Sequence, residues 1–180
     1  MKIGFLSDTH GNLYWTEKSL EILKDCDKIL HLGDVLAPGP RNPITDGYDA
    51  KSLGEILKSR DDITYIKGNC DADVDEMVLD KEVLVSNRLI EWADIKIYAT
   101  HGYEESEEER IAEGLKLGAN IVVSGHTHIK VLKNVDGIAV LNPGSPTLPK
   151  DGIRSVAIYE DGIIKLIDIE NMELIEEMEI

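Results

Sequence analysis

The chain has 180 residues, of which 42% are apolar and 30% charged, as expected for a single folded domain, residues 1–180, with a sizeable core. Its 35 acidic and 19 basic residues give a formal net charge of −16, and no cluster of Lys and Arg offers the basic stripe that bulk binding to nucleic acid requires. No apolar run approaches the roughly 20 residues that span a bilayer, so we expect no membrane association.

The chain begins with a short apolar strand. Residues 2–6 form a buried-strand run that leads directly into Ser7 and Asp8, whereas a signal peptide needs a longer apolar segment. We therefore expect a cytoplasmic protein.

The two cysteines, Cys26 and Cys70, are too few for a disulfide framework or for a structural zinc site of their own. Cys26 fits a buried position near a helix end.

The first half of the chain alternates strands and helices. The apolar spacing of residues 12–26 predicts an amphipathic helix, and Asp49 is a suitable N-cap for a second helix. A long loop with the sequence APGPRNPITDGYD lies between the second strand and that helix. The predicted strands of this half are 2–6, 28–32 and 63–66.

The second half is rich in strands. Its one predicted helix, 107–117, starts within a run of glutamates, which suit the positive end of the helix dipole and form either a solvated helix start or an acidic lid over a site. The tail, 171–180, favours a strand, with a helix nearly as suitable. Both halves together predict two packed sheets with helices outside them. The predicted strands here are 95–99, 120–123, 131–135, 138–141, 155–159 and 163–169.

Five segments place metal-ligand side chains directly after a strand: SDTHG, GDV, GNCD, THG and GHTH. Ligands of α/β proteins bind beyond the carboxyl ends of strands, so these segments can converge on one pocket. Mixed imidazole and carboxylate donors suit Mn, Fe, Zn or Co better than Mg or Ca, and seven donors fit two ions that share a carboxylate. The remaining histidine, His31, lies inside a strand and is expected to pack or hydrogen bond there. The seven candidates are Asp8, His10, Asp34, Asn69, His101, His126 and His128.

These segments resemble the five motif blocks of the calcineurin-like metallophosphoesterase superfamily. The stretches GDVLAPGPRNPITDGY, GNCD, GHTH and NPGS are similar to its YfcE-like phosphodiesterases, and the similarity runs from Met1 to about Pro149. It implies an α/β fold, a four-layer α/β/β/α sandwich of two mixed sheets flanked by helices. It also implies a binuclear-metal phosphodiesterase in which a metal-bridging hydroxide attacks phosphorus.

The resemblance further implies a role for each donor. Asp34, Asn69 and His101 are expected to act in catalysis on a small phosphorylated substrate. The expected cofactors are two divalent metal ions, foremost Mn2+, with Zn2+, Fe2+, Ni2+ or Co2+ as alternatives. Asp8, His10 and His128 would hold the first ion, Asn69, His101 and His126 the second, and Asp34 would bridge the two.

Two further residues are expected to bind the substrate. Arg41, the only cation of the loop after Asp34, could meet a phosphate oxygen, with an exposed loop arginine as an equal alternative. Cys70 takes the place where many related phosphatases carry a histidine that assists the leaving group. A thiol is a poor general acid for an alkoxide, so we expect a preference for phosphodiesters over monoesters. A packed cysteine without influence on specificity is the alternative.

The same motifs also occur in proteins with other functions, which we consider as alternatives. A scaffold of the Vps29 type has this fold with a degraded site, but all seven donor positions are filled here. A nuclease of the superfamily is disfavoured by the acidic charge, whereas a phosphomonoesterase is a further alternative.

Asn142 and Ser145 of NPGS are predicted to form a structural turn rather than a wall of the pocket. We expect a homodimer or homotetramer through sheet edges and an apolar tail made of Met172, Leu174, Ile175, Met178 and Ile180.

Overall fold

The computed structural model describes residues 1–180, and its strands form two mixed sheets. The larger sheet has six strands in the order β11-β10-β9-β1-β2-β3, and the smaller has five in the order β4-β5-β6-β8-β7. The six strands are β1 (Lys2–Leu6), β2 (Lys28–His31), β3 (Ile63–Tyr65), β9 (Ser155–Glu160), β10 (Ile163–Asp168) and β11 (Glu173–Glu179). The five are β4 (Asn87–Trp92), β5 (Ile95–Thr100), β6 (Ile121–Val123), β7 (Val131–Val135) and β8 (Ile138–Asn142).

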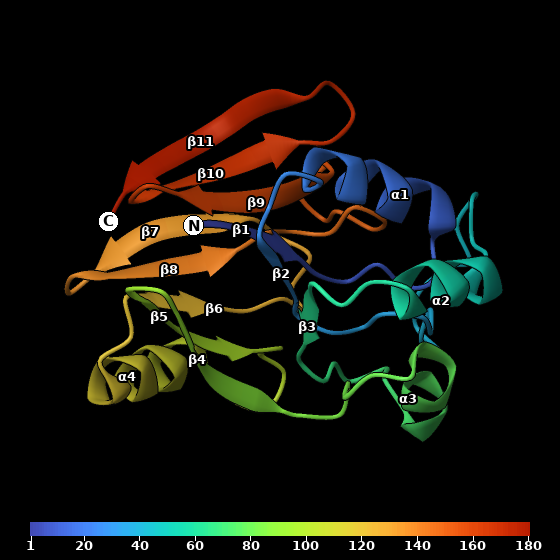
Figure 1. Ribbon diagram of the computed structural model, residues 1–180, viewed down its shortest axis with the longest axis horizontal. Coiled ribbons are helices and arrows are strands. Elements are labelled where there is room, and N and C mark those ends of the chain that lie inside the picture. Colours follow the sequence, from blue (N-terminus) through green and yellow to red (C-terminus); the bar gives the residue numbers. More distant parts are fainter.

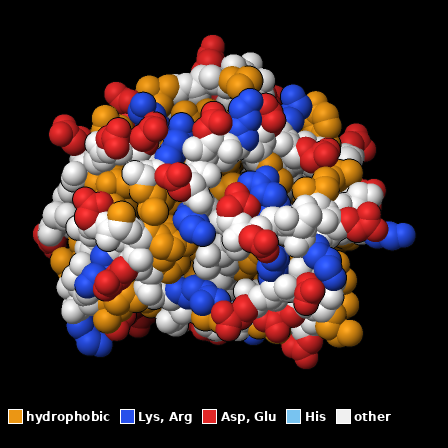
Figure 2. All heavy atoms as spheres, in the orientation of Figure 1, with side chains coloured by type: hydrophobic (Ala, Val, Ile, Leu, Met, Phe, Trp, Pro, Cys, Tyr) orange, Lys and Arg blue, Asp and Glu red, His pale blue; other side chains and the backbone are white.

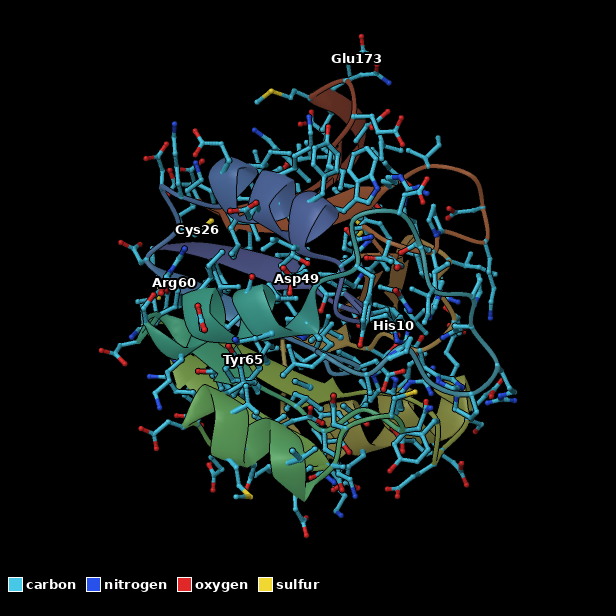
Figure 3. The ribbon with its side chains drawn as sticks, turned by 90° about the vertical axis from the view of Figure 1, so that its right-hand side faces the viewer. His10, Cys26, Asp49, Arg60, Tyr65 and Glu173 are labelled. Atoms are coloured by element: carbon cyan, nitrogen blue, oxygen red, sulfur yellow. The ribbon has the colours of Figure 1, made fainter.

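Helices cover the outer faces of the two sheets, which confirms the four-layer α/β/β/α arrangement (Figure 1). Figure 3 shows three of the helices stacked over the six-stranded sheet, while the fourth packs on the other one. The helices are α1 (Leu13–Ile22), α2 (Ala50–Lys58), α3 (Asp73–Leu79) and α4 (Glu107–Leu117).

The alternation of side chains along the strands builds the layers. On β1, Ile3 and Phe5 join a cluster of 17 buried residues between the sheets, whereas Leu6 joins a cluster of 15 beneath the helices α1 to α3. On β6, Val123 faces the other sheet, and Val122 lies in a small cluster near α4. Successive side chains of a strand point to opposite faces, so strands buried on both faces read as continuous apolar runs.

Local signals in the sequence account for most helix ends. The Asp49 side chain caps α2 by accepting a hydrogen bond from the Ser52 amide at 3.0 Å, as predicted. The glutamate run starts α4 through a capping box between Ser106 and Glu109, and none of the glutamates lines the cavity described below. Cys26 lies in the core beneath the helices, as expected.

The structure differs from the predicted elements in three places: the first helix ends at Ile22 rather than at residue 26, and α3 and β4 were not predicted. The tail forms the strand β11, paired with β10, which was the favoured prediction. The helix α3 and the strand β4 had no clear signal in the sequence. Three large apolar residues of α3, Val74, Met77 and Val78, are exposed, and β4 is an edge strand that buries only Ile90, so neither shows a regular apolar period.

The surface carries charges of both signs. On the face shown in Figure 2, Lys and Arg lie among Asp and Glu and form no continuous basic stripe. None of the helices combines the length and the apolar character needed to cross a membrane.

Candidate active site

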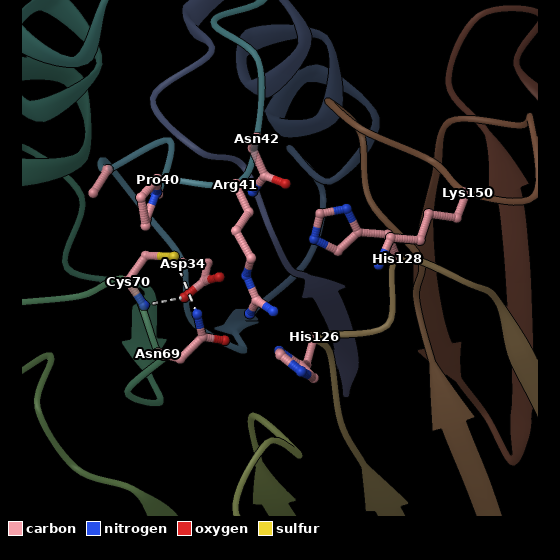
Figure 4. A pocket seen from close by; sticks show the side chains of 11 residues that line it. Asp34, Pro40, Arg41, Asn42, Asn69, Cys70, His126, His128 and Lys150 are labelled. Carbon is pink, nitrogen blue, oxygen red and sulfur yellow. Dashed lines mark hydrogen bonds between the residues drawn. The ribbon is translucent and has the colours of Figure 1, made fainter.

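A cavity of about 680 Å³ opens where the strands of both sheets end. It brings together segments that follow β2, β3, β6 and β8, although they are far apart in the chain (Figure 4). This is the edge at which α/β proteins bind ligands. Its lining residues are Asp34, Ala37, Gly39, Pro40, Arg41, Asn42, Asn69, Cys70, His126, His128 and Lys150.

Two buried carboxylates and three histidines form the centre of the site. The Oδ1 atom of Asp8 lies 3.2 Å from Nε2 of His128 and 3.8 Å from Nε2 of both His10 and His101. The Oδ2 atom of Asp34 lies 3.7 Å from Nε2 of His10 and 3.6 Å from Nε2 of His101. Residues predicted from four separate strand ends therefore meet at one point.

The three central histidines are held in one tautomer. Each ring places Nδ1 within hydrogen-bond distance of a backbone carbonyl, and a carbonyl oxygen only accepts, so Nδ1 carries the proton. The Nε2 atom of each ring then points to the carboxylates and can act as a ligand when a cation displaces any proton it carries. The carbonyl partners are Ala37 for His10 at 3.0 Å, Leu32 for His101 at 2.6 Å and Leu148 for His128 at 2.8 Å.

This arrangement of atoms fits divalent cations. Oδ1 of Asp8 and Nε2 of His101 are buried without a hydrogen-bond partner, which is costly unless another ligand satisfies them. The Nε2 atoms of His10 and His128 lie 3.2 Å apart, close enough for both to bind one cation. The donor atoms of Asp8, His10 and His128, the set predicted for the first ion, lie within 4.8 Å of one another.

The remaining two predicted donors stand at the rim of the same cavity. The ring of His126 lies 5.2 Å from that of His101, and the His126 side chain is half-buried. Asn69 is exposed, and its amide nitrogen lies 3.2 Å from the sulfur of Cys70. The structure thus places the two donors beside the centre, on the side that opens to solvent.

The protonation states of the centre follow from burial and from the neighbouring charges. Burial alone would raise the pKa of Asp8, but His128 and His101 outweigh it and hold the pKa below its usual range. Asp34 is affected in the same way through His101. Burial alone would lower the pKa of His101, but Asp34 and Asp8 raise it to about 9. Both carboxylates are therefore ionised at neutral pH, and the centre attracts cations.

Most of the donor residues adopt a left-handed backbone. Such a conformation costs roughly 1–2 kcal/mol for a residue with a side chain, and it persists where surrounding contacts hold it. Here it turns the side chains at the strand ends toward a common point. The φ angles are 54° at Asp8, 46° at His10, 56° at Asp34, 65° at His126 and 57° at His128.

Asp71 organises the site, although nothing in the sequence pointed to this role beyond the presence of an acid next to Cys70. Its buried carboxylate accepts hydrogen bonds from the backbone amides of Asp34 at 2.8 Å, Val35 at 2.8 Å and Gly68 at 2.7 Å. It therefore ties the loop after β2 to the loop after β3. Burial, the largest effect, raises the pKa of Asp71, and the three amide donors oppose that shift.

The NPGS segment is a structural turn, as predicted. The side chain of Ser145 donates to the carbonyl of Asp8 at 2.8 Å, and the side-chain amide of Asn142 donates to the carbonyl of Gly125 at 2.8 Å. The turn therefore holds two of the donor loops in place and does not line the cavity.

His31 is also structural, because it is fully buried and its Nε2 lies 3.0 Å from the hydroxyl of Thr9.

The two residues predicted to contact substrate both line the cavity. The backbone amide of Cys70 donates to Oδ1 of Asp34 at 2.8 Å, and its sulfur packs against Gly39. Burial and the charge of Asp34 raise the pKa of the Cys70 thiol to about 12, so the thiol is neutral. Arg41 is exposed, and its guanidinium extends toward the space between Asn69 and His126 (Figure 4).

Comparison with known proteins gives a consistent match. The calcineurin-like phosphoesterase superfamily domain matches residues 1–161. The phosphodiesterase YfcE of Escherichia coli K12 is 31% identical over 100% of this chain and 98% of its own, and the structure of YfcE, described as a phosphoesterase, superposes with a TM-score of 0.89. Phosphodiesterase MJ0936 of Methanocaldococcus jannaschii is 31% identical over 89% of this chain and 93% of its own. Vps29 of Entamoeba histolytica shares the fold, with a TM-score of 0.66 at 18% identity.

The first prediction concerns Asp71. Asp71→Asn replaces one carboxylate oxygen with an NH2 group, so at least one of the three backbone N–H groups loses its acceptor, and we expect a loss of about 2 kcal/mol in the free energy of unfolding, since a buried N–H left unpaired costs roughly 1–3 kcal/mol. Urea denaturation measures the loss. The control is Asp73→Asn, at an exposed position two residues along. Equal stability of the two variants would show that Asp71 does not hold the loops together.

Proposed function

The chain belongs to the calcineurin-like phosphoesterase superfamily, and we propose that it is a phosphodiesterase that hydrolyses a small phosphorylated substrate with the help of two divalent cations. The observation that carries this proposal is the meeting of two ionised carboxylates with three histidines whose Nε2 atoms all face those carboxylates. When bound, the cations would neutralise phosphoryl oxygens and lower the pKa of a water molecule.

The residues present divide the donors between two ions. We propose that Asp34 bridges the ions, because Oδ1 is held by the Cys70 amide and Oδ2 points to the central histidines. Mixed nitrogen and oxygen donors suit Mn2+, our first choice, as well as Zn2+, Fe2+, Ni2+ or Co2+. The proposed ligands are Asp8, His10 and His128 for the first ion and Asn69, His101 and His126 for the second.

The other residues of the cavity would orient the phosphoryl group. Arg41 is proposed to bind a non-bridging phosphoryl oxygen, since its guanidinium extends into the cavity and matches an oxyanion in shape and charge. Asn69 adds a neutral donor and therefore leaves the positive charge of a bound cation available to the substrate. The surrounding loops fix the donors in advance, which lowers the cost of reorganisation during the reaction.

Cys70 supports a preference for diesters. Its neutral thiol adds no positive charge beside the centre, although a dianionic monoester would need such a charge more than a monoanionic diester does. The cavity also extends past Cys70 to Gly39 and Pro40, which leaves a surface for an ester arm. A scaffold function of the Vps29 kind would not require this complete set of donors, so the donors favour an enzyme over a scaffold.

We also propose a single domain, residues 1–180, which acts in the cytoplasm as a homo-oligomer. Both cysteines are free, as is usual in a reducing compartment. Ile175 and Met178 of the tail pack against the core between the sheets, whereas Met172 and Leu174 are 70% and 52% exposed. On α3, Met77 is 79% exposed. Exposed apolar side chains on two faces offer surfaces for pairing.

The second prediction concerns metal dependence. Removal of metal with EDTA should abolish hydrolysis of bis(p-nitrophenyl) phosphate, and Mn2+ should restore it. Asp34→Asn should lower kcat/KM at least about 100-fold and reduce the metal content, because one ligand serves both ions. The matched control is Asp136→Asn, in the turn between β7 and β8. Full turnover by metal-free protein would refute the two-cation proposal.

The third prediction concerns Cys70. Cys70→His should shift the ratio of diester to monoester kcat/KM toward monoesters by about tenfold or more, because an imidazole can protonate a leaving group that the thiol cannot. The ratio is measured with bis(p-nitrophenyl) phosphate and p-nitrophenyl phosphate on metal-loaded protein. Cys70→Ser, which keeps the size of the side chain, should leave the ratio near that of the wild type. An unchanged ratio in the His variant would assign Cys70 to packing.

The fourth prediction concerns assembly. Light scattering at micromolar concentration should give a mass at least twice that of the chain, which is 20.0 kDa. If α3 contributes to the interface, Met77→Glu should lower that mass, since a buried unpaired carboxylate is costly. A monomer mass for the wild-type protein would contradict the proposed oligomer.

A further inference from the structure

Two basic residues line the cavity around its acidic centre, although the chain as a whole is strongly acidic. The net charge is −16, yet the cavity lining contains two cations, Arg41 and Lys150, and one acid, Asp34. Asp34 is already assigned to the proposed cations. The lining that remains for a substrate is therefore positive, and a ligand with more than one negative charge would gain from it.

Lys150 is anchored beside the centre, and its ammonium group is free. Its backbone amide donates to the carbonyl of His128 at 3.0 Å, which fixes the base of the side chain next to a proposed metal ligand. The adjacent acid, Asp151, is taken by Lys130, whose Nζ lies 2.7 Å from Oδ1 of Asp151. Lys150 takes part in none of the ion pairs of the chain and is left to bind an external anion.

Arg41 and Lys150 occupy different parts of the cavity. In Figure 4, Arg41 extends into the space above the centre, whereas Lys150 lies beyond His128, on the side away from Cys70. A cavity of about 680 Å³ is far larger than one phosphoryl group needs and lies in the range of sites for whole small molecules, roughly 300–1,000 Å³. Lys150, an exposed residue, borders the outer end of this cavity, where one ester arm of a bound diester would lie.

We propose that Lys150 binds a second anionic group of the substrate, a phosphate or a carboxylate carried on one ester arm. The substrate class is then a phosphodiester with an additional negative charge beyond the scissile phosphate. This inference rests on the proposed phosphodiesterase function. The other arm would lie against the uncharged wall formed by Gly39, Pro40 and Cys70.

The test compares diesters that differ only in the additional anion. Adenylyl-adenosine with a 5′-phosphate should have a kcat/KM about tenfold higher than adenylyl-adenosine without it, mainly through KM, because only the phosphorylated diester can form a charge-assisted hydrogen bond with Lys150. Lys150→Gln should remove this ratio, and Lys150→Arg should keep most of it. Lys116→Gln changes the net charge equally on the exposed side of α4 and should leave the ratio unchanged.

A second pair separates the two sources of negative charge. Glycerophosphoserine carries a carboxylate that glycerophosphoethanolamine lacks. A preference that depends on Lys150 in either pair supports the inference and identifies phosphate or carboxylate as the anion. Identical ratios in the wild type and in Lys150→Gln for both pairs would overturn it.

A binding measurement provides a readout that does not depend on turnover. By calorimetry, adenosine 3′,5′-bisphosphate should bind more tightly than adenosine 5′-monophosphate to the wild-type protein, and Lys150→Gln should bring the two dissociation constants together. Equal constants in the wild type would speak against the inference. The wild-type protein tested on bis(p-nitrophenyl) phosphate, which has no additional anion, distinguishes failure of the two proposals. Failure to hydrolyse it refutes the diesterase proposal, whereas turnover of it together with no effect of Lys150→Gln on either substrate pair refutes only the second-anion site.

Discussion

Buried negative charge at the meeting point of two sheets is the constraint on which the site depends. Asp8 is fully buried and Asp34 is 3% exposed, and both are ionised. Carboxylates in such a place are unfavourable unless hydrogen bonds and cations compensate them. Ser7 and the amide of His126 satisfy Oδ2 of Asp8, but Oδ1 has no hydrogen-bond partner in the chain. The arrangement is therefore complete only with a positively charged ligand.

The fold supplies that arrangement because both sheets contribute to it. Asp8 and Asp34 follow strands of the six-stranded sheet, whereas His101 and His126 follow strands of the five-stranded sheet. The cluster of 17 buried residues between the sheets sets their separation, and so it also sets the distance between carboxylates and histidines. Close-packed cores resist deformation. A change that shifts one sheet against the other would therefore alter the site without touching any donor.

Contacts beyond the donors hold the loops in conformations that they would not adopt alone. Asp71 joins two loops through three amides, and Ser145 holds the carbonyl of Asp8. These bonds offset the cost of the left-handed backbone at the donor residues. The two ends of the cavity then differ in chemistry, with the neutral thiol of Cys70 at one and the ammonium group of Lys150 at the other. This difference offers a physical basis for choosing between the arms of a diester.

The sequence by itself determined the strands other than β4, the start of α2, both ends of α4 and the identity of the candidate donors. Apolar runs, the cap Asp49 and polar residues after strands are local features, and their physical meaning does not depend on distant parts of the chain. Only the tertiary structure decided the contacts of Asp71, the place of Lys150 and the tautomers of the histidines. Each of these depends on atoms that lie close in space and far apart in sequence, such as Nδ1 of His101 and the carbonyl of Leu32. The helix α3 and the strand β4 escaped prediction for a related reason, since pairing and packing with neighbouring elements stabilise them in place of a regular apolar pattern of their own.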